Sequence, residues 1–168
     1  MSIIDPHLSQ LDVSSRILHL GSGTSDLQNH LRQRGFTNVI NADYEPLAVQ
    51  RGQDLEQQAF GDVKTKYAVA DATCLPQGLP SSEYDLVIDK STVDAVSCAG
   101  EEAFLRMAKG VRGCLKENTT WISLSYSQYR FDVEDLPFEV DVLAKVPAPK
   151  LKETDPDIYY WCYQLQPA

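Results

Sequence analysis

A glycine-rich turn and an acid about 20 residues after it have types and spacing that suit ligand chemistry. The turn Gly21-Ser22-Gly23-Thr24-Ser25 follows a hydrophobic run, and Asp43 ends a second apolar run. Glycines let the backbone approach a ligand closely, and an acid at this distance can accept hydrogen bonds from both hydroxyls of a ribose. The pattern predicts a nucleoside-binding half-domain, with a tight turn that binds no ligand as the alternative.

The residue at position 26 distinguishes between nucleoside cofactors. A dinucleotide-binding turn has its third glycine there, where the pyrophosphate meets the start of the helix, but this chain has Asp26. A carboxylate in the first helical turn repels a phosphate. S-adenosylmethionine has ribose and adenine, no phosphate, and both a sulfonium and an ammonium group. We therefore expect S-adenosylmethionine as the cofactor, and Asp26 counts against an NAD-dependent oxidoreductase.

Four acids stand at or just after the ends of expected strands, namely Asp26, Asp43, Asp71 and Asp89. Ligands of open α/β sheets bind outside the carboxyl ends of the strands. Four acids at one edge of the sheet therefore predict one polar pocket. Each acid alone is equally suited to cap a helix, except that the distance of Asp43 from the glycine turn favours ligand binding.

The position of each residue in the predicted pocket suggests its role. The glycine turn lies against the cofactor, Asp43 accepts the ribose hydroxyls, and Tyr44 either covers the adenine face or packs in the core. Asp71, together with the backbone that follows it, is placed to contact the adenine edge. The predicted cofactor-binding residues are Gly21, Ser22, Gly23, Asp26, Asp43, Tyr44, Asp71, Ala72, Thr73 and Asp89.

The segment after the fourth strand is expected where the methyl group emerges. The predicted catalytic residues there are Asp89, Lys90, Thr92 and Asp94. The two acids are expected to orient the acceptor, and Lys90 to lower its pKa as a neighbouring cation does. His19 is expected to be a wall or strand residue and not a base.

Strand and helix patterns alternate along the chain, which predicts a mostly parallel sheet. The expected strands are 16–20, 38–42, 67–70, 84–88 and 120–125, and the expected helices are 26–34, 46–60, 92–97 and 101–115. Segments 138–146 and 158–165 predict an antiparallel hairpin. The fold class is therefore α/β, a doubly wound, Rossmann-like, seven-stranded sheet with a C-terminal antiparallel hairpin and helices on both faces.

Length and composition limit the classes of protein that fit. The 168 residues suit one domain, 1–168, with a short N-terminal segment 1–15. A net charge of −9 argues against a nucleic-acid surface, and it either attracts a basic protein or aids solubility. No apolar run is long enough to cross a membrane, and the four cysteines show no metal-binding spacing. We expect a cytoplasmic protein with reduced thiols, no metal and no membrane or nucleic-acid partner.

Three segments resemble the class I methyltransferases that modify lysines of translation elongation factor 1-alpha. They are Gly21-Ser22-Gly23-Thr24-Ser25, Asn41-Ala42-Asp43-Tyr44 and Tyr84-Asp85-Leu86-Val87-Ile88-Asp89-Lys90-Ser91-Thr92-Val93-Asp94-Ala95. The resemblance covers about residues 16–130. It implies S-adenosylmethionine as cofactor, with ribose and adenine contacts at Asp43 and Asp71, and a lysine of a basic protein as acceptor.

The chain departs from the family pattern at a few positions. Ser22 replaces a cysteine, Thr24 an asparagine and Ser91 a glycine. Serine at position 91 predicts an ordinary backbone conformation there, since positive φ favours glycine. Only 15 residues precede the first expected strand, where the family carries a longer segment that closes over the cofactor.

Three other functions remain as alternatives to a protein-lysine methyltransferase. The first is a methyltransferase that acts on a small molecule, which requires an enclosed apolar pocket. The second is a methyltransferase that acts on another protein atom. The third is a non-catalytic subunit that binds the cofactor or serves as a scaffold.

Overall fold

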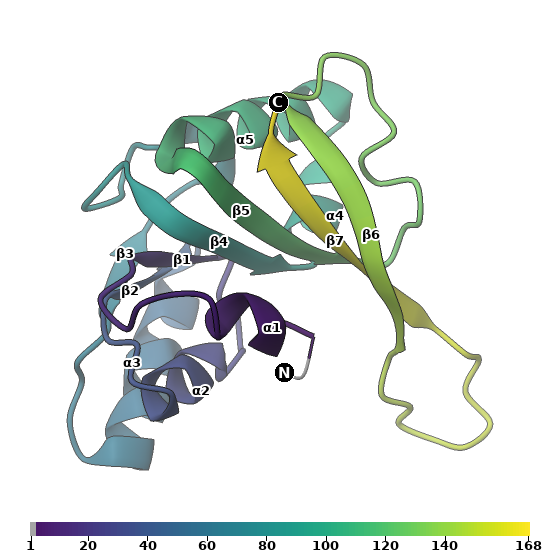
Figure 1. Cartoon of the computed structure of the whole chain (residues 1–168). Helices are drawn as coiled ribbons and strands as arrows, with labels where there is room; N and C mark the ends of the chain where they lie inside the picture. Colours follow the sequence, from purple (N-terminus) through teal and green to yellow (C-terminus); the bar gives the residue numbers. More distant parts are fainter. Residues whose placement is uncertain (1–2) are drawn as a thin grey trace.

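The computed structural model describes residues 3–168 and contains one seven-stranded mixed sheet in the order β3-β2-β1-β4-β5-β7-β6 (Figure 1). The strands are β1 Ile17–Leu20, β2 Val39–Asp43, β3 Lys66–Val69, β4 Tyr84–Lys90, β5 Leu115–Ser125, β6 Phe138–Pro147 and β7 Tyr159–Pro167. Strands β1 to β5 pair in parallel, whereas β7 is antiparallel to both β5 and β6. The predicted fold class is confirmed.

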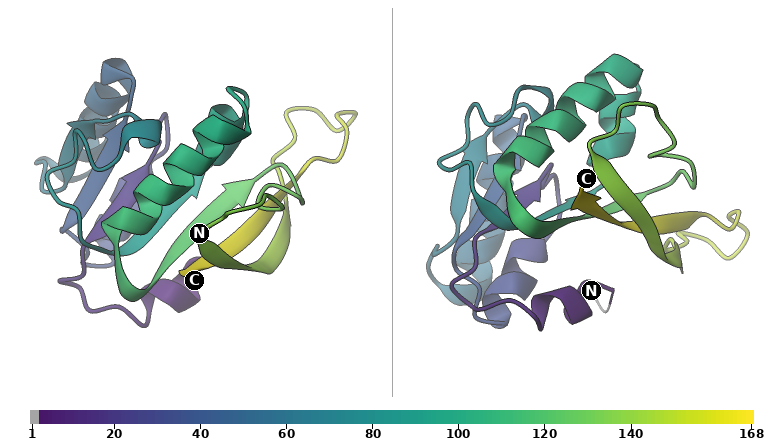
Figure 2. Two further views of the ribbon diagram at one scale, coloured as in Figure 1. Left: turned by 90° about the horizontal axis from the view of Figure 1, so that it is seen from above. Right: turned by 45° about the horizontal axis from the view of Figure 1, so that its top comes forward.

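Helices lie on both faces of the sheet (Figure 2). The helices are α1 Asp5–Leu8, α2 Leu27–Gln33, α3 Pro46–Phe60, α4 Thr92–Ser97 and α5 Glu101–Cys114, with a 3-10 turn η1 at Ala72–Cys74. β1 and β2 are buried along their whole length because helices cover both of their faces. Within residues 3–168, no helix combines the length and apolar character needed to span a bilayer.

Each face of the sheet has its own hydrophobic core. One core joins α4, α5 and η1 to the sheet around Trp121, which packs edge-on against Phe131 and Phe138. The other core joins α1 and α2 to the sheet through residues such as Leu8 and Leu31. The loops of the candidate site begin at the carboxyl ends of the central strands, which separate the two cores.

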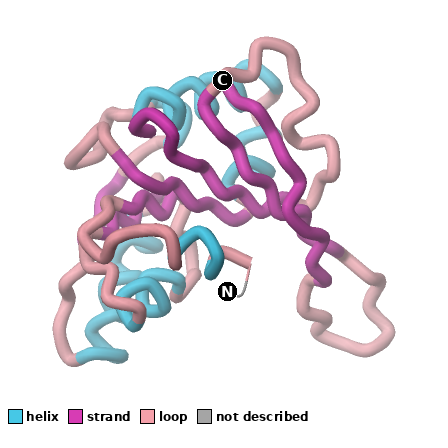
Figure 3. The backbone as a smooth tube through the Cα atoms, viewed as in Figure 1, coloured by secondary structure: helices cyan, strands magenta, loops and turns pink. Residues whose placement is uncertain are grey.

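The structure differs from the sequence expectations mainly at element boundaries. Helix α1 was not expected, because four residues are too few to show a helical period. Strand β5 begins directly after α5, since Leu115 turns from helical to extended backbone with no glycine or proline between the two elements. The loop between β6 and β7 lies at the free end of the hairpin (Figure 3).

A buried carboxylate ties α2, α3 and β3 together. Glu56 is fully buried and accepts hydrogen bonds from Arg32 Nη1 at 2.7 Å, from the Thr65 hydroxyl at 2.6 Å and from the Tyr67 hydroxyl at 2.9 Å. The backbone N–H groups of Lys64 and Thr65 add two more donors. Burial raises the pKa of Glu56, but these donors together outweigh it and leave that pKa below its usual value.

We expect Glu56→Gln to lower the free energy of unfolding by about 3 kcal/mol, because a buried glutamine side chain cannot accept all the hydrogen bonds of this network and Arg32 keeps only Asp62 as a charged partner. Urea denaturation measures the loss. The matched control is Glu102→Gln, whose carboxylate pairs with Arg106 at the surface. This control should change the same free energy by less than about 0.5 kcal/mol. Equal effects of the two substitutions would contradict a structural role for the buried pair.

Candidate active site

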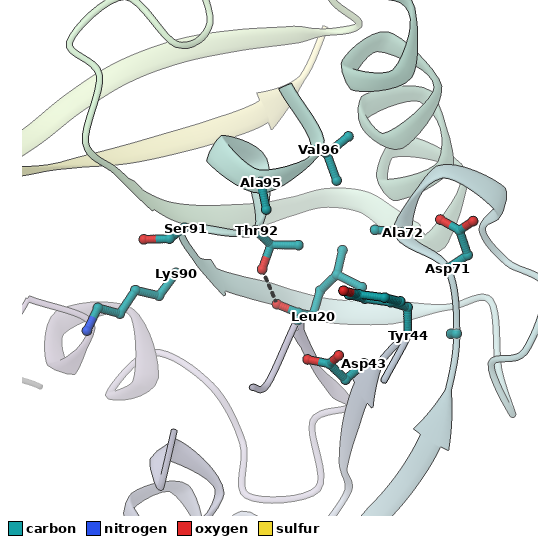
Figure 4. Close-up of a pocket in the computed structure, with 12 residues that line it drawn as sticks. Leu20, Asp43, Tyr44, Asp71, Ala72, Lys90, Ser91, Thr92, Ala95 and Val96 are labelled. Carbon is teal, nitrogen blue, oxygen red and sulfur yellow. Dashed lines mark hydrogen bonds between the residues drawn. The ribbon is translucent and has the colours of Figure 1, made fainter. Parts of the chain in front are cut away.

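A cavity of about 420 Å³ opens at the carboxyl ends of β1, β2 and β4 (Figure 4). Its walls come from the glycine turn, the ends of β2 and β3, and the start of α4. The lining residues are Leu20, Gly21, Asp43, Tyr44, Ala70, Asp71, Ala72, Lys90, Ser91, Thr92, Ala95 and Val96. We call this space the first cavity; it brings together seven of the residues predicted from the sequence.

The glycine turn is held tightly against the start of α4. Gly21 has a φ of +66°, and a Cβ atom at this position would overlap the Thr92 side chain. The Thr92 hydroxyl donates a hydrogen bond of 3.1 Å to the carbonyl of Leu20. Thr92 therefore fixes the end of β1 against α4 and leaves room there only for glycine.

Asp43 connects the end of β2 to the same turn. Its carboxylate accepts hydrogen bonds from the backbone N–H of Gly23 at 2.8 Å and of Glu45 at 3.0 Å. A carboxylate has about four lone-pair sites, so two remain for a ligand. Asp43 is 7% exposed and lines the first cavity, where this acceptor capacity suits a pair of ribose hydroxyls.

Asp71 caps the 3-10 turn that follows it and also lines the first cavity. Its carboxylate accepts hydrogen bonds from the backbone N–H and the hydroxyl of Thr73, each at 2.8 Å. These bonds, led by that of the backbone N–H, lower the pKa of Asp71. Thr73 thus contacts Asp71, and Ala72 provides the cavity wall.

Tyr44 is not a core residue, because 76% of it is exposed. Figure 4 shows its ring beside Leu20 at the first cavity. Core packing, which was the alternative use of Tyr44, is therefore excluded. An exposed ring at this position is available to cover a flat ligand such as adenine.

Asp89 is buried at the end of β4 and binds the start of α4. One oxygen accepts from the indole N–H of Trp121 at 2.8 Å, and the other from the backbone N–H groups of Thr92 and Val93. Burial raises the pKa of Asp89 to about 6, although these donors favour the ionised form. These bonds give Asp89 a structural role in positioning the first turn of α4.

Lys90 and Asp94, the other two residues predicted to be catalytic, contact side chains from β7 and from the loop after β5. The ammonium of Lys90 lies 4.9 Å from the centre of the Tyr160 ring, a cation–π contact. Asp94 accepts hydrogen bonds from Arg130 Nη2 at 2.8 Å and from the Ser125 hydroxyl at 2.6 Å. Asp94 thus ties α4 to the loop after β5. Nothing in the local sequence pattern marked Arg130 as its partner, because 36 residues separate them.

Ser91 adopts the backbone conformation of the glycine it replaces in the motif. Its φ is +63°, in the left-handed region, so the expectation of an ordinary backbone was wrong. The tight turn from β4 into α4 requires this conformation whichever residue occupies the position. A non-glycine residue there costs about 1 kcal/mol or somewhat more.

A second cavity, of about 230 Å³, lies on the face of the sheet that α1 and α2 cover. Six of its twelve lining residues are aliphatic, and Lys90 lines both cavities. The residues that line it are Ile3, Ile4, His19, Ser25, Asp26, Leu27, His30, Ile88, Asp89, Lys90, Leu124 and Val146. The four strand-end acids therefore do not form one pocket, because two line the first cavity and two line the second.

His19, on β1, is a neutral wall residue of the second cavity. Burial lowers its pKa to about 4, although a hydrogen bond to Asn41 and the charge of Asp43 oppose the shift. Its Nδ1 lies 3.0 Å from Asn41 Oδ1. Asp26, also predicted for the cofactor site, lines this cavity instead and lies 3.5 Å from His30 Nε2.

Comparison with known proteins identifies relatives across the chain. Residues 18–123 match the family model described as "Methyltransferase domain". Methyltransferase srdJ of Neurospora crassa is 53% identical over 170 residues, covering 99% of this chain and 73% of that protein. Human EEF1A lysine methyltransferase 2 is 32% identical over 107 residues, and this chain spans only 43% of its length.

Solved structures share the fold at low sequence identity. The TehB-like S-adenosylmethionine-dependent methyltransferase of Corynebacterium glutamicum superposes with a TM-score of 0.67 at 14% identity, covering 99% of this chain and 86% of that chain. TrmN of Thermus thermophilus superposes with a TM-score of 0.75 at 13% identity, covering 99% of this chain and 47% of that chain.

We expect Gly21→Ala to be more damaging than Gly23→Ala. Both glycines have positive φ, which costs an alanine about 1–2 kcal/mol, but only a Cβ at position 21 overlaps Thr92. A Cβ at Gly23 finds its nearest neighbour at 3.9 Å. Gly21→Ala should therefore lose about 2 kcal/mol more of the free energy of unfolding in urea. Equal losses would contradict the close contact between the turn and Thr92.

The depressed pKa of His19 predicts a pH-dependent stability. Between about pH 6.5 and pH 4 the unfolded chain binds a proton at His19 that the folded protein does not. The stability of the wild type, relative to the non-titrating variant His19→Gln, should therefore fall as the pH is lowered through this window. The full change is about 3 kcal/mol, measurable by urea denaturation at each pH. A pH-independent difference would contradict the buried, neutral histidine.

Proposed function

The chain belongs to the S-adenosylmethionine-dependent methyltransferases, and from this membership we propose that it methylates a small molecule held in the second cavity. The cofactor occupies the first cavity in this proposal. The acceptor reaches it from the α1 and α2 face of the sheet, past Lys90, which lines both cavities.

The residues of the first cavity fit S-adenosylmethionine. Gly21 lines the cavity, and Thr92 fills the space that a Cβ atom would take, so the turn and α4 form one continuous wall. Asp43 has acceptor sites that suit the ribose hydroxyls, and Asp71 and Ala72 line the same cavity, where they suit contact with the adenine edge. Asp43 and Asp71 favour a ligand with positive groups over one with phosphates. S-adenosylmethionine supplies an electrophilic methyl group, and the protein positions it.

The aliphatic wall of the second cavity is the observation that carries the proposal. Six aliphatic side chains line it, namely Ile3, Ile4, Leu27, Ile88, Leu124 and Val146. Ile3 and Ile4 belong to the N-terminal segment, which covers this side of the site. A space of about 230 Å³ with these six aliphatic side chains in its wall suits a ring-sized group, since small-molecule sites bury an apolar body and use polar groups to orient it.

A protein lysine is the second candidate acceptor. Several EEF1A lysine methyltransferases are 30–35% identical to this chain over 101–110 residues, and the segment from Asp89 to Asp94 resembles their motif. The geometry supports this candidate less well. Asp89 is fully buried and Asp94 is paired with Arg130, so neither carboxylate is free to orient an acceptor ammonium group.

Labelled methyl transfer tests the proposal. The protein is incubated with S-adenosylmethionine carrying a radioactive methyl group and with a cell extract, which is then separated into protein and small-molecule fractions. We expect the label in the small-molecule fraction. Label in the protein fraction would favour the lysine candidate. Cofactor binding without transfer to either fraction would favour a non-catalytic subunit.

Asp43→Asn should weaken binding of S-adenosylmethionine by about tenfold or more, because a charged acceptor for the ribose is lost. Isothermal titration calorimetry measures the dissociation constant. The matched control is Asp141→Asn, an exposed acid on β6, which should leave that constant unchanged. An unchanged dissociation constant in Asp43→Asn would contradict the proposal that the ribose binds at the end of β2.

A further inference from the structure

We propose that His19 is a positioning residue of the second cavity, whose Nε2 accepts a hydrogen bond from an O–H or N–H group of the methyl acceptor. This inference rests on the proposed use of that cavity as the acceptor site. It narrows the acceptor to a molecule with an apolar body and one hydrogen-bond donor, such as a phenol, an alcohol, an indole or an amine.

A chain of buried hydrogen bonds fixes the tautomer of His19. The carbonyl of Lys66 can only accept, so the nitrogen of the Asn41 side chain, 3.2 Å away, must donate to it. The oxygen of the same side chain therefore faces His19 Nδ1, at 3.0 Å. Nδ1 must carry the proton of the neutral ring, and Nε2 is left with a lone pair.

The same chain is anchored at the buried carboxylate of α3. The side-chain nitrogen of Asn41 also donates to the Thr65 hydroxyl at 3.1 Å, and that hydroxyl donates to Glu56 at 2.6 Å. Glu56 is in turn paired with Arg32. Protein groups alone therefore fix the orientation of the Asn41 side chain, before any ligand binds.

Nε2 of His19 makes no hydrogen bond to any of residues 3–168, while the ring lines the second cavity. The other polar side chains of the cavity are either bound or open to solvent. Both oxygens of Asp89 accept hydrogen bonds, the Ser25 hydroxyl accepts from the backbone N–H of Leu27, and Lys90 contacts an aromatic ring. The side chains of Asp26 and His30 are 65% and 40% exposed, so water can solvate them. His19 is 2% exposed, so its lone pair is a buried acceptor, and a ligand without a donor would leave it unpaired.

Hydrogen bonding, not proton abstraction, is the role that the environment allows. Burial lowers the pKa of His19 to about 4, which makes its nitrogen a weak base near neutral pH. A neutral ring still accepts a hydrogen bond. His19 thus holds the donor group of the acceptor in place.

The test compares two probes of similar shape, phenol and toluene, in the wild type and in His19→Phe. Calorimetry or ligand-observed NMR gives the four dissociation constants. We expect the preference for phenol over toluene to be about tenfold larger in the wild type. The control is His7→Phe, a histidine on α1 that does not line the second cavity and should keep the wild-type preference. An equal preference in the wild type and in His19→Phe would overturn the proposal.

The ¹⁵N chemical shifts of the wild-type protein test the same contact without any substitution. Phenol should shift the Nε2 resonance of His19 toward a hydrogen-bonded value, and toluene should not. An Nε2 chemical shift typical of a protonated nitrogen would contradict the assigned tautomer. An Nε2 chemical shift that phenol leaves unchanged would contradict the contact.

Binding of S-adenosylhomocysteine separates an acceptor contact from a cofactor contact. Its affinity should be equal in the wild type and in His19→Phe. A tenfold loss in the variant would place the amino-acid end of the cofactor on His19 and overturn the acceptor assignment. If the phenol result holds but label transfers only to proteins, the proposed function fails while the hydrogen-bonding role of His19 stands.

Discussion

The reversal of strand order between β1 and β4 is the constraint on which the site depends. These two parallel strands pair directly, but the chain leaves β1 toward α2 on one face of the sheet and leaves β4 toward α4 on the other. The loops diverge from adjacent strand ends, and ligands of open α/β sheets bind at such a point. Both cavities lie here, one on each face. The contact between Gly21 and Thr92 holds the two loops together at their closest approach.

The two cavities differ in chemistry because different elements line them. The first receives carboxylates from the ends of β2 and β3, which suits a ligand with hydroxyls and positive charge. The second receives six aliphatic side chains, from the segment before α1 and from α2, β4, β5 and β6, beside polar side chains that include His19 and Asp26. In the proposed reaction, polar groups hold the charged cofactor, and the aliphatic side chains bury an apolar part of the acceptor. Figure 4 shows the first cavity.

Much of the fold and of the candidate site was predictable from local sequence patterns. The glycine turn, Asp43 and Asp71 lie at strand ends because hydrophobic runs mark the strands and parallel strands end at one edge. The partners of Asp94 and Asp89 were not predictable, because Arg130 and Trp121 are more than 30 residues away and only tertiary packing brings them near. For the same reason, the sequence did not indicate that the acids divide between two faces of the sheet.

A crystal structure with S-adenosylhomocysteine bound would test the central claim most directly. The claim is that the first cavity holds the cofactor and leaves the second cavity for the acceptor. We predict that the ribose hydroxyls lie within hydrogen-bond distance of Asp43, that the adenine lies beside Asp71 and Ala72, and that the aliphatic space around His19 stays free. An adenine or amino-acid moiety lodged in that aliphatic space would contradict the account.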